Sequence, residues 1–185
     1  MSQPSQDERL LKALAVAFVD HPRATLKELA EAAGVSKATL HRFCGTRDNL
    51  VDRVVDHGFA VLEQIISTPD LLAGEPLAAL RDLIREHLAH REMLVFMMFQ
   101  YRPETLQSEH DMARMRPYFD ALDAFFLRCQ QSGLLRIDTP APVMTELLTS
   151  LIWGMVDAER RGRAAPAQSA QTIEQIFLQG AARAS

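Results

Sequence analysis

Apolar residues recur every three or four positions along most of this chain, the spacing that puts side chains on one face of an α-helix. The sequence has no alternating β-branched runs of strand length and no Asn-Gly or Asp-Gly hairpin turn. The pattern therefore predicts an all-α fold of about nine helices. After a first helix, two short helices within residues 25–44 and a longer one stopped by Pro69, we expect helices at residues 76–90, 91–101, 107–132, 140–162 and 168–182.

The stretch from Thr25 to Cys44, TLKELAEAAGVSKATLHRFC, carries the most information. Thr25 and Glu28 have the spacing of a capping box, which starts a helix, and Ser5 with Glu8 repeats that spacing before the first helix. Gly34 can take the left-handed conformation that ends a helix, and Ser36 can cap the next one. These signals predict two short helices joined by a glycine turn.

The second short helix is expected to point polar side chains outward while Leu40 and Phe43 face inward. The outward residues are Ser36, Lys37, Ala38, Thr39, His41 and Arg42. Small hydroxyls and cations can approach phosphates and base edges, which is the layout of a helix-turn-helix in the DNA major groove. The plain alternative is a structural helical hairpin with a solvated face, but such a face normally mixes charges, and no acid lies between Glu31 and Asp48.

The helix expected at residues 107–132 carries an apolar stripe that suits a facing helix. The stripe consists of Met112, Met115, Phe119, Leu122, Phe126 and Cys129. Pro117 lies inside this run, so the helix either kinks there or starts there. Gly133 is placed to end it, and Thr139 with Pro140 resembles a capped helix start. The alanine-rich stretch from Gly162 to Ala170 is predicted as a loop.

Composition and charge narrow the classes of protein. The chain has 185 residues, 48% of them hydrophobic and 24% charged, which is typical of a soluble globular protein. The sequence has no leader pattern and no apolar run of membrane-spanning length, and we therefore expect a cytoplasmic protein. Cys44 and Cys129 lack the spacing of a metal or redox site, which suits a reducing compartment and predicts inert core thiols.

The net charge of −4 is unevenly spread, because residues 1–51 carry +1 and the remainder −5. Non-specific attraction to phosphate should accordingly be weak, so that specificity depends on a few contacts which a dimer would double. We predict a helix-turn-helix DNA-binding domain at residues 1–50 and a helical effector-binding and dimerisation domain at residues 51–185. The long helix that Thr46 caps would connect the two.

The run LAEAAGVSKATLHRFCGTRDNL, from Leu29 to Leu50, resembles the DNA-binding motif of the TetR family of bacterial transcriptional repressors. Elsewhere the resemblance lies in helix number, helix lengths and the connector from Gln131 to Pro140. The family usually has tyrosine where this chain has His41 and phenylalanine where it has Cys44. The resemblance implies an operator-reading motif, and the expected DNA-binding residues are Thr25, Ser36, Lys37, Ala38, Thr39, His41, Arg42 and Arg47.

Methionine and aromatic side chains crowd residues 93–126. Methionines suit a pocket that re-packs around varied ligands, although a loosely packed core gives the same pattern. TetR-family proteins hold an inducer in an apolar cavity between the middle helices, so the resemblance implies a ligand site. The expected ligand-binding residues are Phe59, Met93, Met97, Tyr101, Met115, Phe119 and Trp153.

The last two helices have apolar residues on more than one side, which predicts a four-helix dimer contact about a two-fold axis. The function implied is that of a homodimeric repressor, released from a palindromic double-stranded operator by an apolar small-molecule inducer. The alternative is a helix-turn-helix regulator without a small-molecule effector.

An all-helical enzyme is the alternative from another class, with His87, His90 and Glu86 as acid–base candidates. The sequence has no nucleophile–base pair, glycine-rich phosphate loop, HExxH motif or dinucleotide fingerprint. We therefore identify no catalytic residue and expect no cofactor. His87 and His90 could supply half of a metal site, but two imidazoles without further ligands are more often solvated or pocket-lining, and we predict no metal site.

Overall fold

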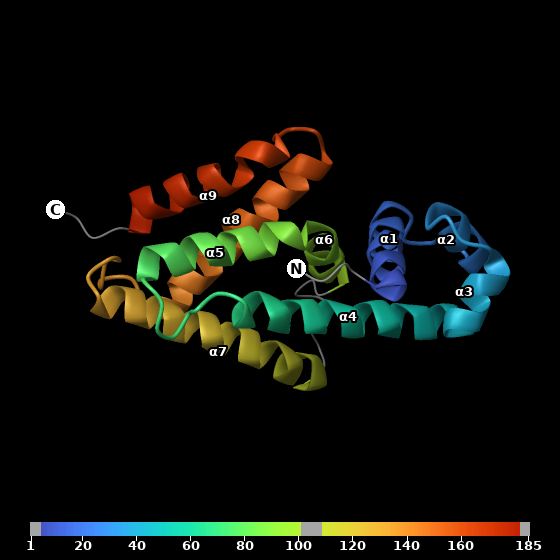
Figure 1. The fold of residues 1–185 in the computed structure, drawn as a ribbon, viewed down its shortest axis with the longest axis horizontal. Helices are drawn as coiled ribbons and strands as arrows, with labels where there is room; N and C mark the ends of the chain where they lie inside the picture. The colour runs from blue at the N-terminus through green and yellow to red at the C-terminus, as the bar shows by residue number, and fades with distance from the viewer. Residues whose placement is uncertain (1–4, 101–108, 182–185) are drawn as a thin grey trace. The chain divides into compact units, whose positions relative to one another are not determined.

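The computed structural model describes residues 5–100 and 109–181, and this part of the chain is helical without a β-strand (Figure 1). The prediction of an all-α fold is confirmed. The helices are α1 (Gln6–Asp20), α2 (Leu26–Ala32), α3 (Lys37–Cys44), α4 (Arg47–Ser67), α5 (Pro76–Ala89), α6 (Arg91–Gln100), α7 (Glu109–Gln131), α8 (Ala141–Arg160) and α9 (Pro166–Ala181). None of these described helices is long and apolar enough to cross a membrane.

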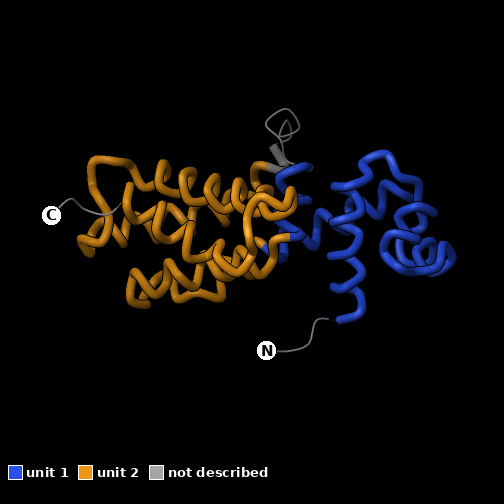
Figure 2. Tube along the Cα trace, turned by 90° about the horizontal axis from the view of Figure 1, so that it is seen from above, with its two compact units in different colours: residues 1–61, 92–105 blue, residues 62–91, 106–185 orange. Residues whose placement is uncertain are grey.

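The chain divides into two compact units, coloured separately in Figure 2. Unit 1 comprises residues 1–61 and 92–105, and unit 2 comprises residues 62–91 and 106–185. Helix α4 belongs to unit 1 up to Val61 and to unit 2 from Leu62 onward. Nearly all of α6 belongs to unit 1, although α6 follows α5 of unit 2 in the sequence. The predicted domain boundary at residue 50 stays a prediction.

Unit 1 has a core of leucines and a valine beneath its first four helices. Five side chains, from α1 to α4, have no exposed surface: Leu14, Leu29, Leu40, Leu50 and Val54. Burial of a leucine side chain contributes about 2 kcal/mol each to folding. This core holds the two short helices of the helix-turn-helix in place.

The local capping signals mark helix starts as predicted. Ser5 with Glu8 and Thr25 with Glu28 form reciprocal capping boxes at α1 and α2. The hydroxyl of Thr46 accepts a 3.2 Å hydrogen bond from the backbone N–H of Asn49 at the start of α4. Such caps satisfy N–H groups that have no partner within the helix.

Helix α7 continues through Pro117 instead of starting there, and the chain turns after it at Gly133, whose φ is +80°. The predicted apolar stripe is buried only in part, because Met112 in the first turn is 48% exposed while Leu122 and Phe126 are fully buried. The stripe therefore packs over the later turns of α7.

Two other helix starts differ from the prediction. Helix α8 begins at Ala141 with Pro140 at the N-cap and no side-chain cap bond, so Thr139 does not cap it. Helix α9 begins at Pro166, inside the stretch predicted as a loop. Proline suits the first turn of a helix because its fixed φ is helical and no N–H partner is needed there.

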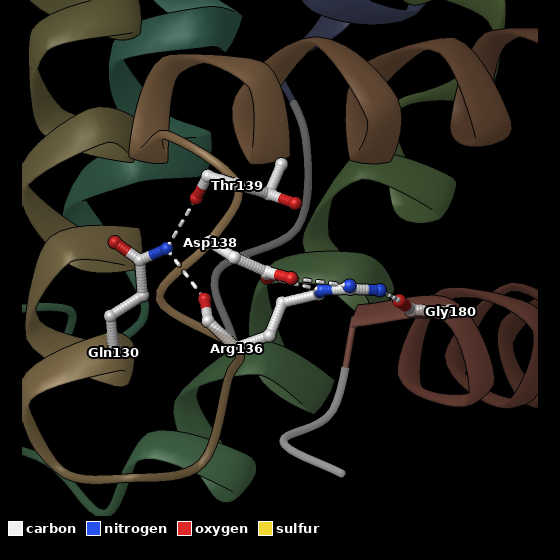
Figure 3. Close-up of polar contacts among 5 residues, drawn as sticks. All are labelled: Gln130, Arg136, Asp138, Thr139 and Gly180. Atoms are coloured by element: carbon white, nitrogen blue, oxygen red, sulfur yellow. Dashed lines mark hydrogen bonds and ion pairs between the residues drawn. The ribbon is translucent and has the colours of Figure 1, made fainter.

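The connector between α7 and α8 is tied to α7 and to α9 by side chains (Figure 3). Nε2 of Gln130 donates to the carbonyl oxygens of Arg136 and Thr139, at 2.7 and 2.6 Å. Arg136 forms a two-pronged ion pair with Asp138, and its Nη1 donates to the carbonyl oxygen of Gly180 at 3.2 Å. These contacts hold the start of α8 beside the end of α9.

Candidate nucleic-acid interface

The turn between α2 and α3 is a hydrogen-bonded glycine turn. Gly34 has φ +69°, in the left-handed region that side chains disfavour. The N–H of Gly34 donates to the carbonyl of Glu31 at 3.1 Å, and that of Val35 donates to Ala30 at 2.9 Å. This closure of α2 fixes the direction in which α3 leaves.

The cap of α3 uses two of the hydroxyls expected to meet DNA. The Ser36 hydroxyl accepts a 3.0 Å bond from the N–H of Thr39 and lies 2.8 Å from the Thr39 hydroxyl. The bond between these two hydroxyls uses the hydrogen of only one of them, so the hydrogen of the other hydroxyl remains available to a partner outside the protein. Ser36 is exposed and Thr39 is half-buried.

Helix α3 presents an exposed face with a positive charge. Lys37, Ala38, His41 and Arg42 are exposed. The opposite side buries Leu40 and Cys44, and the Cys44 thiol, whose pKa is raised by burial, donates to the carbonyl of Leu40. The face combines cations with small side chains, which is what base and phosphate contacts need.

Phe43, expected to point inward, is half-buried, and the guanidinium carbon of Arg53 on α4 lies 4.6 Å from its ring centre. The sequence pattern missed this contact because it joins two helices. Arg9 was missed too: it lines a groove of about 560 Å³ together with Asp7, Thr39 and Arg42. No periodicity in the sequence links α1 to this groove.

Two further expected DNA-binding residues, Thr25 and Arg47, are engaged within unit 1. Thr25 is exposed, and its hydroxyl takes part in the capping box with Glu28, donating to Oε2 at 2.8 Å. Arg47 donates from Nε to the carbonyl of Ala24 at 3.1 Å and from Nη2 to that of Pro22 at 2.7 Å. The Arg47 guanidinium carbon also lies 5.4 Å from the centre of the Phe18 ring. Arg47 thus links the start of α4 to the segment before α2. Its contact with DNA phosphate stays a prediction.

The expected ligand-binding residues fall in both units. In unit 1, Met93 and Met97 are buried and Phe59 is half-buried. In unit 2, Met115 is buried while Phe119 and Trp153 are half-buried. Tyr101 lies outside the described residues. Their role in ligand binding stays a prediction.

Both ring nitrogens of His87 have partners, the carbonyl of Leu83 and the hydroxyl of Tyr118, each at 2.7 Å. His87 is therefore not disposed to bind a metal. Among the residues that the structure describes, no group of three or more His, Cys, Asp or Glu side chains could hold a metal ion.

No protein-family model matches the chain. The chain is 66% identical over 181 residues to the HTH-type transcriptional regulator NfxB of Pseudomonas aeruginosa, which covers 98% of this chain and 97% of that protein. It is 29% identical over 114 residues to the HTH-type transcriptional repressor LfrR of Mycolicibacterium smegmatis, covering 62% and 57% of the two chains.

Solved structures share the fold. The TetR-like regulator LfrR from Mycobacterium smegmatis, in complex with proflavine, superposes with a TM-score of 0.73 at 22% identity, over 94% of each chain. The ketosteroid regulator KstR2 of Mycobacterium tuberculosis gives a TM-score of 0.69 at 18% identity, over 99% of this chain and 98% of that one. At these identities the solved structures show a common architecture.

Proposed function

Because this chain belongs to the TetR family of helix-turn-helix transcriptional regulators, we propose that it is a homodimeric repressor, released from a palindromic operator by a small-molecule inducer. The family identifies the chain as a DNA-binding transcriptional regulator. Its relatives are regulators and not enzymes, so the alternative of an all-helical enzyme is wrong. The action as a repressor, the dimer contact, the inducer and the cytoplasmic location are parts of the proposal.

The observation that carries the proposal is the exposed face of α3. Lys37, His41 and Arg42 project from a helix whose cap and preceding turn are hydrogen-bonded, and no acid lies on α3 to oppose phosphate. One α3 from each protomer would enter successive major grooves, with half-sites about 34 Å apart or a multiple of that distance.

The dimer contact is proposed on α8 and α9. Val143 and Leu147 on α8 are 43% and 49% exposed, and Ile176 on α9 is 50% exposed. A Cβ built on Gly154 or Gly180 would meet no atom within 4 Å, so a second chain could approach both glycines closely. The buried Leu148, Ile152, Val156, Ile173 and Phe177, by contrast, are already used within the protomer. Paired across a two-fold axis, the outward faces would form a four-helix bundle.

An apolar inducer is proposed in unit 2, among Met115, Phe119 and Trp153. Support comes from the family and from the relative LfrR, which was solved in complex with proflavine. An inducer that favours a geometry unsuited to the operator weakens DNA binding. Because coupling between two sites is reciprocal, bound DNA must weaken the binding of that inducer to the same extent.

A gel-shift titration with the promoters of the protein's own gene and its neighbours tests DNA binding. Lys37→Ala and Arg42→Ala should each weaken binding by about fivefold or more and lower the slope of log affinity against log salt by about one. Arg116→Ala, an exposed arginine on α7, is the matched control. Wild-type affinity in both α3 variants would remove the assignment of α3 as the recognition helix.

Sedimentation tests the dimer. Leu147→Glu should produce a monomer, while Leu127→Glu, equally exposed on α7, should not. A dimer that survives Leu147→Glu and Ile176→Glu would refute the α8–α9 contact.

Thermal shift with proflavine and a library of hydrophobic compounds tests the inducer. A compound that stabilises the wild type, but not Phe119→Ala, should also release the operator. If no compound stabilises the protein, the regulator acts without a small-molecule effector.

A further inference from the structure

The outward face of α9 has a row of glutamines. Gln171, Gln175 and Gln179 stand four residues apart and are exposed. The buried Ile173 and Phe177 lie on the opposite side of the helix. None of the three glutamine amides has a hydrogen-bond partner within the part of the chain that the structure describes. This glutamine row is therefore a polar ridge whose hydrogen-bonding groups are open to a partner.

The outward face of α9 also lacks charge. Glu174 is the only charged residue among the sixteen of this helix. Its Oε1 accepts a 2.9 Å hydrogen bond from Nε of Arg81 and lies 2.8 Å from Nη2, so its charge is paired on the side of α5. By contrast α5, with fourteen residues, has four charged side chains: Arg81, Asp82, Arg85 and Glu86. An uncharged exposed face is thus not the rule for the helices of this chain.

Contact between two copies of the chain accounts for both features. We propose that the glutamine row of α9 pairs with the same row of a second protomer, about a two-fold axis that passes through Gln175. A residue at such an axis faces its own copy. Two like charges would repel each other there, whereas an amide has both donor and acceptor groups and can pair with an identical amide. This inference rests on the proposed dimer and identifies the residues at its centre.

The spacing of the glutamine row fits this axis. A helix and its copy run antiparallel when the two-fold axis is perpendicular to them, and Gln171 and Gln179 lie equally far from Gln175 on either side. Gln171 of one protomer therefore lies opposite the partner's Gln179, and the reverse pair forms as well. Residues four apart form a ridge on the helix surface, and two such ridges interdigitate in the commonest class of helix packing.

The next row on α9 supplies apolar surface and room for the second copy. Thr172, Ile176 and Gly180 also stand four residues apart. Ile176 is half exposed, and a Cβ on Gly180 would meet no atom within 4 Å. The exposed Leu147 on the adjacent α8 extends the apolar surface. Burial of these apolar groups would stabilise the dimer, while the amides would fix its register, as single polar residues do in coiled coils.

Sedimentation equilibrium of the full chain with charged variants of Gln175 tests the inference. Gln175→Glu and Gln175→Lys should each weaken the dimer about tenfold or more, because like charges then meet at the axis. An equimolar mixture of the two variants should restore a dimer at least as tight as that of the wild type, since opposite charges then meet. Circular dichroism checks that both variants keep the helical content of the wild type.

Two further sets of variants serve as controls. Gln64→Glu and Gln64→Lys place the same charges on an exposed glutamine of α4 and should leave the dimer unchanged. Gln175→Leu introduces no charge and should associate at least as tightly as the wild type.

The outcomes separate this inference from the proposed dimer. A wild-type dimer that tolerates both charges at Gln175, yet dissociates in Leu147→Glu, would overturn the inference and leave the α8–α9 contact in place. A mixture as weak as its two components would also overturn it, because Gln175 would then meet another part of the partner. A wild type that sediments as a monomer would overturn the dimer and the inference together.

Discussion

The hydroxyl of Tyr118 on α7 donates a 2.7 Å hydrogen bond to Nε2 of His87 on α5, and both side chains are buried. The direction follows from the other nitrogen: Nδ1 lies 2.7 Å from the carbonyl oxygen of Leu83, which can only accept. Burial lowers the pKa of His87 to about 4, so near pH 7 the ring is neutral, its single proton is on Nδ1, and Nε2 accepts. This pair joins two helices of unit 2 through one specific protonation state.

Acid should destabilise the protein through His87. Burial lowers the pKa of His87 from 6.5 to about 4 in the folded chain, against the opposing bond to Leu83. Below pH 6.5 the unfolded chain takes up a proton that the folded chain does not, so the free energy of unfolding should fall by about 2 kcal/mol between pH 7 and 5 from this group alone. Urea unfolding at both pH values, with His87→Gln as reference, measures the effect. Equal losses in the two proteins would contradict it.

Removal of the Tyr118 hydroxyl should leave a buried acceptor without its donor. Tyr118→Phe is expected to lower the free energy of unfolding by about 1 to 3 kcal/mol. In a double-mutant cycle with His87→Leu, the combined loss should be smaller than the sum of the single losses, because either change alone already breaks the bond. Additive losses would show that the two side chains are not coupled.

Gly58 allows Met97 of α6 to pack closely against α4. A Cβ on Gly58 would overlap Sδ of Met97, a buried residue. Gly58→Ala should therefore destabilise the protein by about 1 to 3 kcal/mol, although alanine is the better helix former. In a Met97→Ala background the same change should be neutral or stabilising. Chemical unfolding of the four proteins would show this, and equal effects in both backgrounds would refute the close contact.

Arg47 and Lys37 should separate stability from DNA recognition. Arg47→Ala removes two charged hydrogen bonds to the segment before α2 and should cost about 1 to 3 kcal/mol of unfolding free energy. Lys37→Ala removes an exposed side chain and should change stability by about 0.5 kcal/mol at most, while operator binding weakens. Thermal unfolding and gel shifts of both variants provide the comparison. An Arg47→Ala protein as stable as the wild type would argue that the guanidinium serves DNA alone.

The helix-turn-helix could be predicted from the sequence because its signals are local. Thr25 caps α2, Gly34 turns the chain and Ser36 caps α3 through bonds that span at most five residues. The outward face of α3 follows from the same spacing. The start of α9 at Pro166 was missed because a proline among alanines fits a loop and a first helical turn equally well.

Only the tertiary structure decided which residues far apart in the sequence contact one another. The family resemblance assigned Arg47 to DNA, but its hydrogen-bond partners in the structure stand 23 and 25 positions away along the chain. His87 and Tyr118 are 31 positions apart. Gly58 on α4 lies against Met97 on α6, although α5 stands between these two helices in the sequence. Side-chain periodicity determines which face of a helix is apolar, and so it identified the helices and the DNA-reading motif of this protein. Side-chain periodicity does not specify which helix packs on that face. Packing depends on the shapes of the side chains and on hydrogen-bond partners that come together only when the chain folds.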